Sequence, residues 1–442
     1  MKLFGSSGIR SVVDKEFLQL TFEIGQALGN SYHSVLIGCD TRTSSDAMRY
    51  AFLSGLLSAG ATASYAGIVP TPTLAHATKH FEAGAMITAS HNPPQYNGIK
   101  LTNPDGSAFD AAQREQIEER VSAKSSQTAP WEEIGKCQDY PGAIDEHIER
   151  ILADFPTQFK LKVAVDGGCG AASAVTPYLL TKLGCDVVPL NCQPDGYFPR
   201  GLETIPENLG DLVKTVKSEG ADLGIAHDGD GDRIAVVDEK GRFVASDKLM
   251  VLFARQLGAT KVVTTVDASM LIDELGFEVV RTRVGDAFVS DELRHSAPEN
   301  TEESFGGESS GCFIFPRVSL CPDAIYAAAK IVEVASEHRI STLADQIPSY
   351  PVLRGGVPGD KAVMEEIERR LKREVESGGR LETVDGLRLS ISDGWLLIRP
   401  SGTEPKIRIT AEATSEQRAE ELYNLGLRTT KECLIRRERA TT

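Results

Sequence analysis

The segments VLIGCD (35–40) and DAMRYAFLSGLLSAG (46–60) are typical of one strand followed by one helix. The first is a short apolar run, and the second has apolar residues at helical spacing and ends in glycine. The pattern recurs where LKVAVDGG (161–168) precedes a helical stretch at about 172–183, and KVVTTVDASMLIDELG (261–276) begins a third strand–helix unit. Strands that alternate with helices predict an α/β fold with parallel-rich sheets.

The rest of the chain indicates several domains. Apolar runs at 85–90, 221–228, 234–244 and 277–286 predict further strands. The C-terminal part differs, because a charged amphipathic helix precedes strands and a final helix. We therefore predict three related mixed α/β domains and a C-terminal α+β domain. The predicted domains are 1–150, 151–250, 251–350 and 351–442.

The composition excludes several classes of protein. The formal net charge of the 442-residue chain is −16, which opposes nonspecific binding to nucleic acid or to an anionic membrane. No stretch reaches the roughly eighteen apolar residues of a membrane span, and the N-terminus lacks the apolar core of a signal peptide. Eight cysteines without CxxC spacing predict reduced thiols rather than disulfides or a zinc site. We expect a cytoplasmic protein.

The segment TASHNPPQYNGIK (88–100) follows a predicted strand, at the strand end where α/β sheets place ligands. Its Pro-Pro and Asn-Gly pairs predict a rigid turn that holds Ser90 outward. A serine nucleophile needs a base, a charge partner or a metal, and His91 and Lys100 are the nearby candidates. The alternative is that Ser90 only caps a turn.

The segment HDGDGDR (227–233) places three carboxylates at alternate positions of a glycine-containing loop. Asp228, Asp230 and Asp232 can converge on one hard cation, which would offset their mutual repulsion. A solvated acidic turn is one alternative. An EF-hand is another, although its sixth position would hold Arg233 instead of glycine and its flanks are predicted strands.

Two further loops carry groups suited to a phosphorylated sugar. In FGGESSGCFIFP (305–316), a carboxylate and hydroxyls can contact sugar hydroxyls, but a plain Gly/Ser turn fits the segment equally well. In RPSGTEPKIRI (399–409), a guanidinium, two hydroxyls and a backbone N–H form a phosphate cradle. A polar hairpin loop is the alternative for this segment.

These four segments, in this order and spacing, resemble the α-D-phosphohexomutase family, and its archaeal phosphoglucosamine mutases and phosphomannomutases in particular. GSSGIR (5–10) and TRVGD (282–286) also match family positions. The resemblance implies four domains around a central cleft, each of which contributes one loop. It also implies a mutase that moves a phosphoryl group between O1 and O6 of a hexose through a hexose 1,6-bisphosphate intermediate.

The resemblance implies a catalytic centre built on phosphoserine. Ser90 would carry the phosphoryl group, while Lys100 and His91 would serve proton transfer and charge stabilisation. Arg10 and Arg233 would lie near the phosphoserine. The ligands of one Mg²⁺ would be phosphorylated Ser90, Asp228, Asp230 and Asp232.

The resemblance also implies a substrate site. Glu308 and Ser310 would bind sugar hydroxyls. The residues that would hold the non-reacting phosphate are Arg283, Arg399, Ser401, Gly402 and Thr403.

Two departures from the family pattern concern the sugar. Several relatives have histidine where this chain has Cys312, and phosphomannomutase/phosphoglucomutase enzymes often have histidine where it has Asp286. The Val-Gly-Asp sequence at 284–286 is closer to that of phosphoglucosamine mutases. We therefore expect glucosamine 6-phosphate and 1-phosphate as substrates, with mannose or glucose phosphates as alternatives.

A metal-dependent phosphatase and a non-catalytic phosphosugar- or calcium-binding module are alternatives of another class. We expect a monomer or homodimer that binds a phosphosugar and neither nucleic acid nor membrane.

Overall fold

The structure, a computed structural model, describes residues 2–5, 7–296, 303–375, 378–401 and 405–441. Its internal contacts divide the chain into two compact units. Unit 1 contains residues 1–259 and 285–346, and unit 2 contains residues 260–284 and 347–442. Unit 2 therefore combines a short internal stretch with the C-terminal part of the chain.

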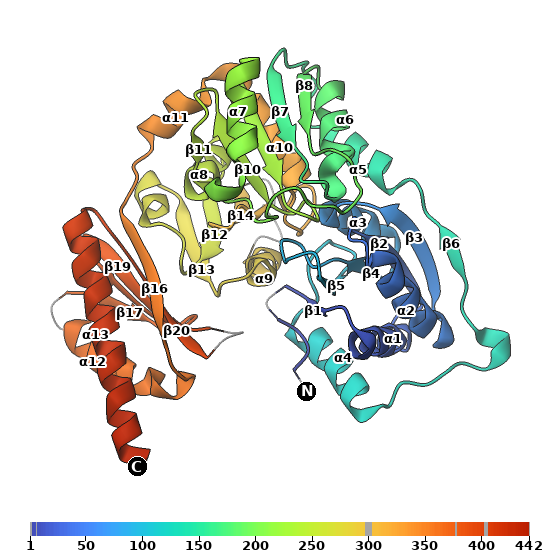
Figure 1. Cartoon of the computed structure of the whole chain (residues 1–442), viewed down its shortest axis with the longest axis horizontal. Helices are drawn as coiled ribbons and strands as arrows, with labels where there is room; N and C mark the ends of the chain where they lie inside the picture. Colours follow the sequence, from blue (N-terminus) through green and yellow to red (C-terminus); the bar gives the residue numbers. More distant parts are fainter. Residues whose placement is uncertain (1, 6, 297–302, 376–377, 402–404, 442) are drawn as a thin grey trace. The chain divides into compact units, whose positions relative to one another are not determined.

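The first sheet of unit 1 has six strands among the described residues, in the order β1-β5-β4-β2-β3-β6 (Figure 1). The strands are Ile9–Val12 (β1), Ser34–Cys39 (β2), Thr62–Ile68 (β3), Ala83–Ile87 (β4), Tyr96–Thr102 (β5) and Cys137–Asp139 (β6). β2 runs parallel to its neighbours β3 and β4, whereas β5 is antiparallel to β4 and β1. The loops after β2 and β4 consequently lie at the same edge of the sheet.

Helices cover both faces of this sheet. Val35 and Ile37 of β2 pack in one hydrophobic core with α1, α2 and α4, whereas Leu36 packs in a second core with α3. Successive side chains of a strand point to opposite faces, so a strand buried on both faces is apolar throughout. The helices are Lys15–Gly29 (α1), Ser45–Ser58 (α2), Thr71–Ala77 (α3), Ala111–Ala123 (α4) and Ala143–Leu152 (α5).

The second sheet of unit 1 has the order β11-β10-β9-β7-β8. Its strands are Lys162–Asp166 (β7), Asp186–Leu190 (β8), Leu223–His227 (β9), Ile234–Asp238 (β10) and Phe243–Val244 (β11). β9 is parallel to β7 and antiparallel to β10, and Leu212 and Val216 of α7 (Gly210–Glu219) pack in its core. A turn that contains Lys240 and Gly241 connects β10 to β11, with Gly241 in the left-handed region at φ +74. β9 and β10 are both buried, and the short loop that connects them contains residues 228–233.

Aromatic side chains join several of the remaining elements of unit 1. Phe253 of α8 contacts Phe305 and Phe313, which belong to the hairpin of β14 and β15. This hairpin carries the loop expected to contact sugar hydroxyls. The elements are Val175–Lys182 (α6), Ser246–Leu257 (α8), Asp286–Ser296 (α9), Ser304–Gly307 (β14), Phe313–Ile314 (β15), Ala324–Glu337 (α10) and Ile340–Gln346 (α11).

Unit 2 contains a parallel strand pair and an antiparallel sheet. β12 (Lys261–Thr265) is parallel to β13 (Glu278–Thr282). The sheet has the order β16-β20-β19-β18-β17 and packs against α12 (Met364–Val375) and α13 (Glu416–Thr441) (Figure 1). Its strands are Val352–Pro358 (β16), Arg380–Glu382 (β17), Leu387–Ile391 (β18), Gly394–Pro400 (β19) and Lys406–Ala413 (β20). This is the α+β unit expected at the C-terminus.

One expected element differs. The segment at 261–276 was expected to form a strand and an α-helix, but β12 is followed by a 3-10 helix, Met270–Leu275. This segment ends at Gly276 in the left-handed region, so too few residues are available to propagate an α-helix. None of the helices in the described part of the chain combines the length and the apolar composition needed to cross a membrane.

Candidate active site

Ser90 lies in the loop between β4 and β5. The strand expected at 85–90 ends at Ile87, which leaves Ser90 in the loop with φ +50. A non-glycine residue in this left-handed region costs roughly 1–2 kcal/mol, so its surroundings must hold it there. Ser90 Oγ donates a hydrogen bond to Asp228 Oδ2 at 2.6 Å and lies 3.3 Å from His91 Nδ1. Ser90 therefore does more than cap a turn, because its side chain joins two loops.

The three aspartates follow β9 and form one buried group. Asp228, Asp230 and Asp232 each offer a carboxylate oxygen, and these atoms lie within 4.8 Å of one another. Asp228 Oδ1 accepts hydrogen bonds from the backbone N–H groups of Gly231 (3.1 Å) and Arg233 (3.2 Å). All three carboxylates are buried, so the alternative of a solvated acidic turn is wrong.

The EF-hand alternative is also wrong. β9 and β10 flank the loop, where an EF-hand has helices. Glu239, which would be the last ligand, accepts hydrogen bonds from the backbone and hydroxyl of Ser341 instead.

The donor set suits a divalent cation. Asp230 Oδ1 and Asp232 Oδ1 are buried and, among the described residues, have no hydrogen-bond partner. The other oxygens of both carboxylates contact Lys100 Nζ, at 2.6 Å for Asp230 and 2.5 Å for Asp232. Buried carboxylate oxygens without partners are costly, and Mg²⁺ binds carboxylates and phosphate oxygens. The residues therefore fit the predicted metal.

Burial and mutual repulsion perturb the pKa values of these groups. Burial, followed by the charges of Asp232 and Asp230, raises the pKa of Asp228 well above its usual value. Burial alone would lower the pKa of Lys100, but the carboxylates of Asp230 and Asp232 outweigh it, so the pKa is raised. The two carboxylates thus hold Lys100 as an ammonium in this arrangement.

Positive charge gathers around Ser90. Arg10 Nη1 donates to Asn92 Oδ1 at 2.9 Å, in the same loop as Ser90. Burial and the charges of Arg233 and Arg10 lower the pKa of His91 to about 2, so this imidazole is neutral. Arg233 Nε is buried and has no partner within the described residues. This buried donor is the type of group that can bind a phosphate oxygen.

The loop between β14 and β15 lies beside the aspartate loop. The backbone N–H of Ile234 donates to Gly311 O at 3.0 Å, and Arg233 forms a β-bridge with Cys312. Glu308 Oε2 accepts from Ser310 Oγ at 3.1 Å. The segment forms a Gly/Ser turn, and the same turn holds the buried carboxylate of Glu308. The turn and the predicted sugar-binding loop are therefore compatible interpretations of this segment.

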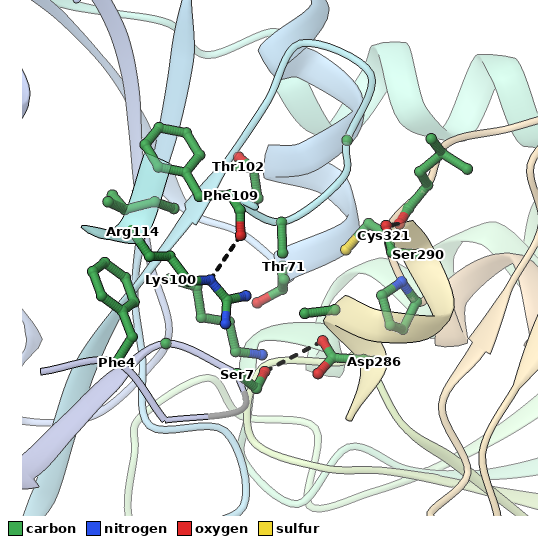
Figure 2. Close-up of a pocket in the computed structure, with 17 residues that line it drawn as sticks. Phe4, Ser7, Thr71, Lys100, Thr102, Phe109, Arg114, Asp286, Ser290 and Cys321 are labelled. Carbon is green, nitrogen blue, oxygen red and sulfur yellow. Dashed lines mark hydrogen bonds between the residues drawn. The ribbon is translucent and has the colours of Figure 1, made fainter. Parts of the chain in front are cut away.

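Lys100 also lines a pocket with Ser7, Thr71 and Asp286 (Figure 2). Thr71 begins α3 and donates from Oγ1 to Asp230 Oδ2 at 2.6 Å, while its N–H donates to Asp230 O at 2.8 Å. Ser7 Oγ donates to Asp286 Oδ2 at 3.3 Å. The sequence did not indicate Thr71, whose only signal is a Pro-Thr-Pro at the start of a helix.

Unit 2 holds the predicted phosphate residues that the structure describes. Asp385 Oδ2 accepts from Arg399 Nη1 at 2.9 Å and from the N–H of Val284 at 3.0 Å. It thereby connects Arg399 to the loop that contains Arg283, a role that no sequence motif indicated. The N–H of Ser401 donates to Lys406 O at 2.7 Å. Gly402 and Thr403 lie outside the described residues.

Models of four domains of the phosphoglucomutase/phosphomannomutase family match the chain in order. The alpha/beta/alpha domains I, II and III match residues 1–128, 144–241 and 245–350, and the C-terminal domain matches residues 356–424. The predicted organisation of three α/β domains and a C-terminal domain is therefore confirmed.

Two archaeal proteins named probable phosphoglucosamine mutase are similar along nearly their whole length. The protein of Methanocella arvoryzae is 48% identical over 440 residues, covering 98% of this chain and 99% of that protein. The protein of Methanosarcina acetivorans is 45% identical over 441 residues, covering 98% of this chain and 100% of that protein. The crystal structure of a phosphoglucomutase/phosphomannomutase family protein from Burkholderia thailandensis superposes with a TM-score of 0.86 at 27% identity, covering 98% of this chain and 97% of that chain. The chain belongs to the phosphoglucomutase/phosphomannomutase family.

Proposed function

We propose that the protein is a phosphohexose mutase that exchanges a phosphoryl group between O1 and O6 of a hexose, with Ser90 as the phosphorylated nucleophile. The observation that carries the proposal is the position of Ser90 Oγ, 2.6 Å from Asp228 in a loop of three buried carboxylates. A serine hydroxyl is a weak nucleophile by itself, and a cation site with nearby basic side chains can activate it.

The reaction would consist of two phosphoryl transfers. Phosphorylated Ser90 gives its group to O6 of a hexose 1-phosphate, so that the Oγ–P bond breaks and an O6–P bond forms. The resulting hexose 1,6-bisphosphate turns over, and its O1 phosphoryl group returns to Ser90. The product is the hexose 6-phosphate, and no phosphate is released to water.

The side chains around Ser90 would stabilise charge and carry protons. Lys100 and His91 would serve proton transfer and charge stabilisation, so that the proton lost by the attacking O6 hydroxyl passes to the Ser90 oxygen released from phosphorus. Arg10 and Arg233 would offset negative charge on the transferring group, which is where most catalysis of phosphoryl transfer arises.

One Mg²⁺ would be held by three aspartates and an oxygen of phosphorylated Ser90. The unpartnered buried oxygens of Asp230 and Asp232 support this assignment. When bound, Mg²⁺ would supply positive charge next to the transferring phosphoryl group.

The remaining loops would hold the substrate. Glu308 and Ser310 would bind sugar hydroxyls, and the phosphate that does not react would be held by Arg283, Arg399, Ser401, Gly402 and Thr403. Each of the four domains, with boundaries near 150, 250 and 350, would contribute one of these loops. The cytoplasmic location and the monomeric or homodimeric state remain predictions.

We propose glucosamine phosphate as the sugar, with mannose or glucose phosphate as the alternative. The name of the Methanocella arvoryzae and Methanosarcina acetivorans relatives supports glucosamine, at 48% and 45% identity. The VGD form of the loop before α9 is a second, independent support.

A coupled assay with Mg²⁺ and hexose 1,6-bisphosphate tests the proposal by comparing glucosamine, mannose and glucose 1-phosphates. We expect the highest kcat/KM with the glucosamine substrate and no turnover by Ser90→Ala. Release of inorganic phosphate in proportion to turnover would instead indicate a phosphatase. Binding without turnover of any of the three substrates would indicate a non-catalytic phosphosugar-binding protein.

A further inference from the structure

A buried ion pair lies behind the Ser90 loop. The side chains of Asp40 and Arg42 are fully buried, and Arg42 Nε donates to Asp40 Oδ2 at 3.0 Å. Both residues follow β2, and Ser90 follows β4, which is parallel to β2. The ion pair and the Ser90 loop therefore lie at the same edge of the first sheet.

The guanidinium of Arg42 holds the backbone of the Ser90 loop. Nη2 donates to the carbonyl oxygens of Ser90 and Asn92, both at 2.7 Å. Nη1 donates to those of Pro93 at 2.8 Å and Tyr96 at 2.9 Å. Together with Nε, these contacts use all five N–H groups of the guanidinium. Arg42 consequently has no guanidinium donor left for a substrate phosphate.

The same ion pair also reaches the backbone N–H of Ser90. Thr88 Oγ1 donates to Asp40 Oδ2 at 2.7 Å and accepts from the N–H of Ser90 at 2.8 Å. Both peptide groups of Ser90 are thus held, the N–H through Thr88 and the C=O through Arg42. Fixing both groups restrains the two backbone dihedrals of a residue whose φ is +50.

Two further contacts close the arrangement around the Ser90 carbonyl. A Cβ on Gly229 would lie only 2.6 Å from Ser90 O, so the aspartate loop can approach Ser90 this closely only with glycine at that position. The ring of Phe198 covers the guanidinium of Arg42, whose centre lies 5.4 Å from the ring centroid. The carbonyl is therefore confined between Arg42 and the loop that carries Asp228.

We propose that Arg42 is a positioning residue that holds Ser90 in its left-handed conformation and thereby directs Oγ at the aspartate loop. The inference rests on the proposed role of Ser90 as nucleophile. Asp40 neutralises the charge of Arg42. Arg42 therefore acts by fixing the backbone of the Ser90 loop rather than by attracting phosphate. Its loss is expected to slow phosphoryl transfer and to leave substrate affinity nearly unchanged.

Arg42→Lys is the informative variant. Lysine keeps the charge next to Asp40, but a single ammonium with three donors cannot replace a planar fork that binds four carbonyls and a carboxylate. We expect phosphorylation of Ser90 to be about 100-fold slower, as is typical when a reacting atom is misplaced by about 1 Å. KM for the hexose phosphate should stay within about twofold of the wild-type value.

The experiment follows phosphate incorporation at Ser90 in the dephosphorylated full-length protein. The probe is glucose 1,6-bisphosphate with Mg²⁺, and intact mass with peptide mapping gives the rate. Arg150→Lys is the matched control, because Arg150 also pairs with a carboxylate, Asp154, at 2.9 Å and donates to a backbone carbonyl, that of Arg317, at 2.8 Å. Melting temperatures separate loss of stability from loss of positioning.

The outcomes distinguish the inference from the proposed function. Slow phosphorylation of folded Arg42→Lys, together with a wild-type rate in Arg150→Lys, supports the positioning role. A wild-type rate in Arg42→Lys overturns it. If Arg42→Lys does not fold, Thr88→Val decides, because it removes the hydroxyl that connects Asp40 to the N–H of Ser90 and leaves Arg42 unchanged. Slowed phosphorylation of this variant supports the positioning role, and a wild-type rate overturns it. If the wild-type protein acquires no phosphate at Ser90, the proposed nucleophile is wrong and the inference falls with it.

Discussion

The Oγ of Ser90 lies 2.6 Å from Oδ2 of Asp228, although the two residues are 138 positions apart in the sequence. Ser90 follows β4 of one sheet and Asp228 follows β9 of another, so the contact joins strand ends from two sheets. The hydroxyl donates to a carboxylate whose pKa is raised by burial and then by Asp232 and Asp230. The hydroxyl therefore links the Ser90 loop to the aspartate loop and stabilises the buried carboxylate by a hydrogen bond.

Replacing Ser90 by glycine and by alanine separates chemistry from backbone strain. Both variants lose the hydroxyl, so both should lose mutase turnover. They differ in the Cβ, which is unfavourable at φ +50. We expect Ser90→Gly to be more stable than Ser90→Ala by about 1 kcal/mol, measured by urea unfolding. Equal stabilities would show that the left-handed conformation carries no strain.

Removing one aspartate should abolish stabilisation by Mg²⁺. A ligand that binds only the folded state raises the melting temperature, and Asp232→Asn removes one charged ligand from the proposed site. We expect Mg²⁺ to raise the melting temperature of the wild-type protein but not that of Asp232→Asn, with at least about tenfold weaker binding by calorimetry.

Asp211→Asn is the control for this measurement, because Asp211 is an exposed aspartate on α7 paired with Lys214. It should respond to Mg²⁺ as the wild-type protein does. An equal response of Asp232→Asn would contradict the assignment of the metal ligands.

Thr71 should tune metal affinity through Asp230. Its Oγ1 donates to Asp230 Oδ2 at 2.6 Å, so loss of the hydroxyl leaves Lys100 as the remaining side-chain contact of this oxygen and weakens the restraint on the carboxylate. We expect Thr71→Val to weaken Mg²⁺ binding by about 10- to 100-fold, the range found for partners that orient metal ligands. Thr71→Ser keeps the hydroxyl and should recover most of the affinity. If valine and serine give the same affinity, the hydrogen bond has no role in metal binding.

Acid should destabilise the protein partly through His76. Burial, assisted by the charges of His147 and Lys79, lowers the pKa of His76 from 6.5 to about 4. Between these values the unfolded state binds a proton that the folded state does not, so stability falls as the pH decreases through this window. His76→Gln cannot take up the proton, so its stability should fall less, by on the order of 1–2 kcal/mol. Urea unfolding between about pH 7 and pH 4 measures this, and parallel stability curves would refute it.

Local patterns in the sequence predicted most of the fold and the main catalytic candidates. Short apolar runs located β2, β7 and β12, because a strand buried in a sheet requires such a run. The third strand–helix unit was only half correct, since Met270–Leu275 forms a 3-10 helix. Ser90 and the aspartates were found because their residue types and spacing form a motif.

Single polar residues that belong to no motif could not be predicted from the sequence. Thr71, Arg42 and Asp385 are single polar residues in loops or at an element boundary, and each acts on a group that is distant in sequence. Asp385, for example, contacts Val284 from 101 positions away. No local pattern distinguishes such a residue from a solvated one, because its partners become neighbours only when strands pair and loops converge.

The sequence by itself determined the fold class, the family and the residue types of the site, because hydrophobic periodicity and the order and spacing of motifs can be read directly along the chain. Only the tertiary structure decided which of those groups meet and in what state of charge. Ser90 reaches Asp228 because Arg42 holds its loop, and Lys100 is an ammonium because Asp230 and Asp232 are buried beside it. These properties depend on close contact and on exclusion of water, which residues distant in sequence acquire only in the folded protein.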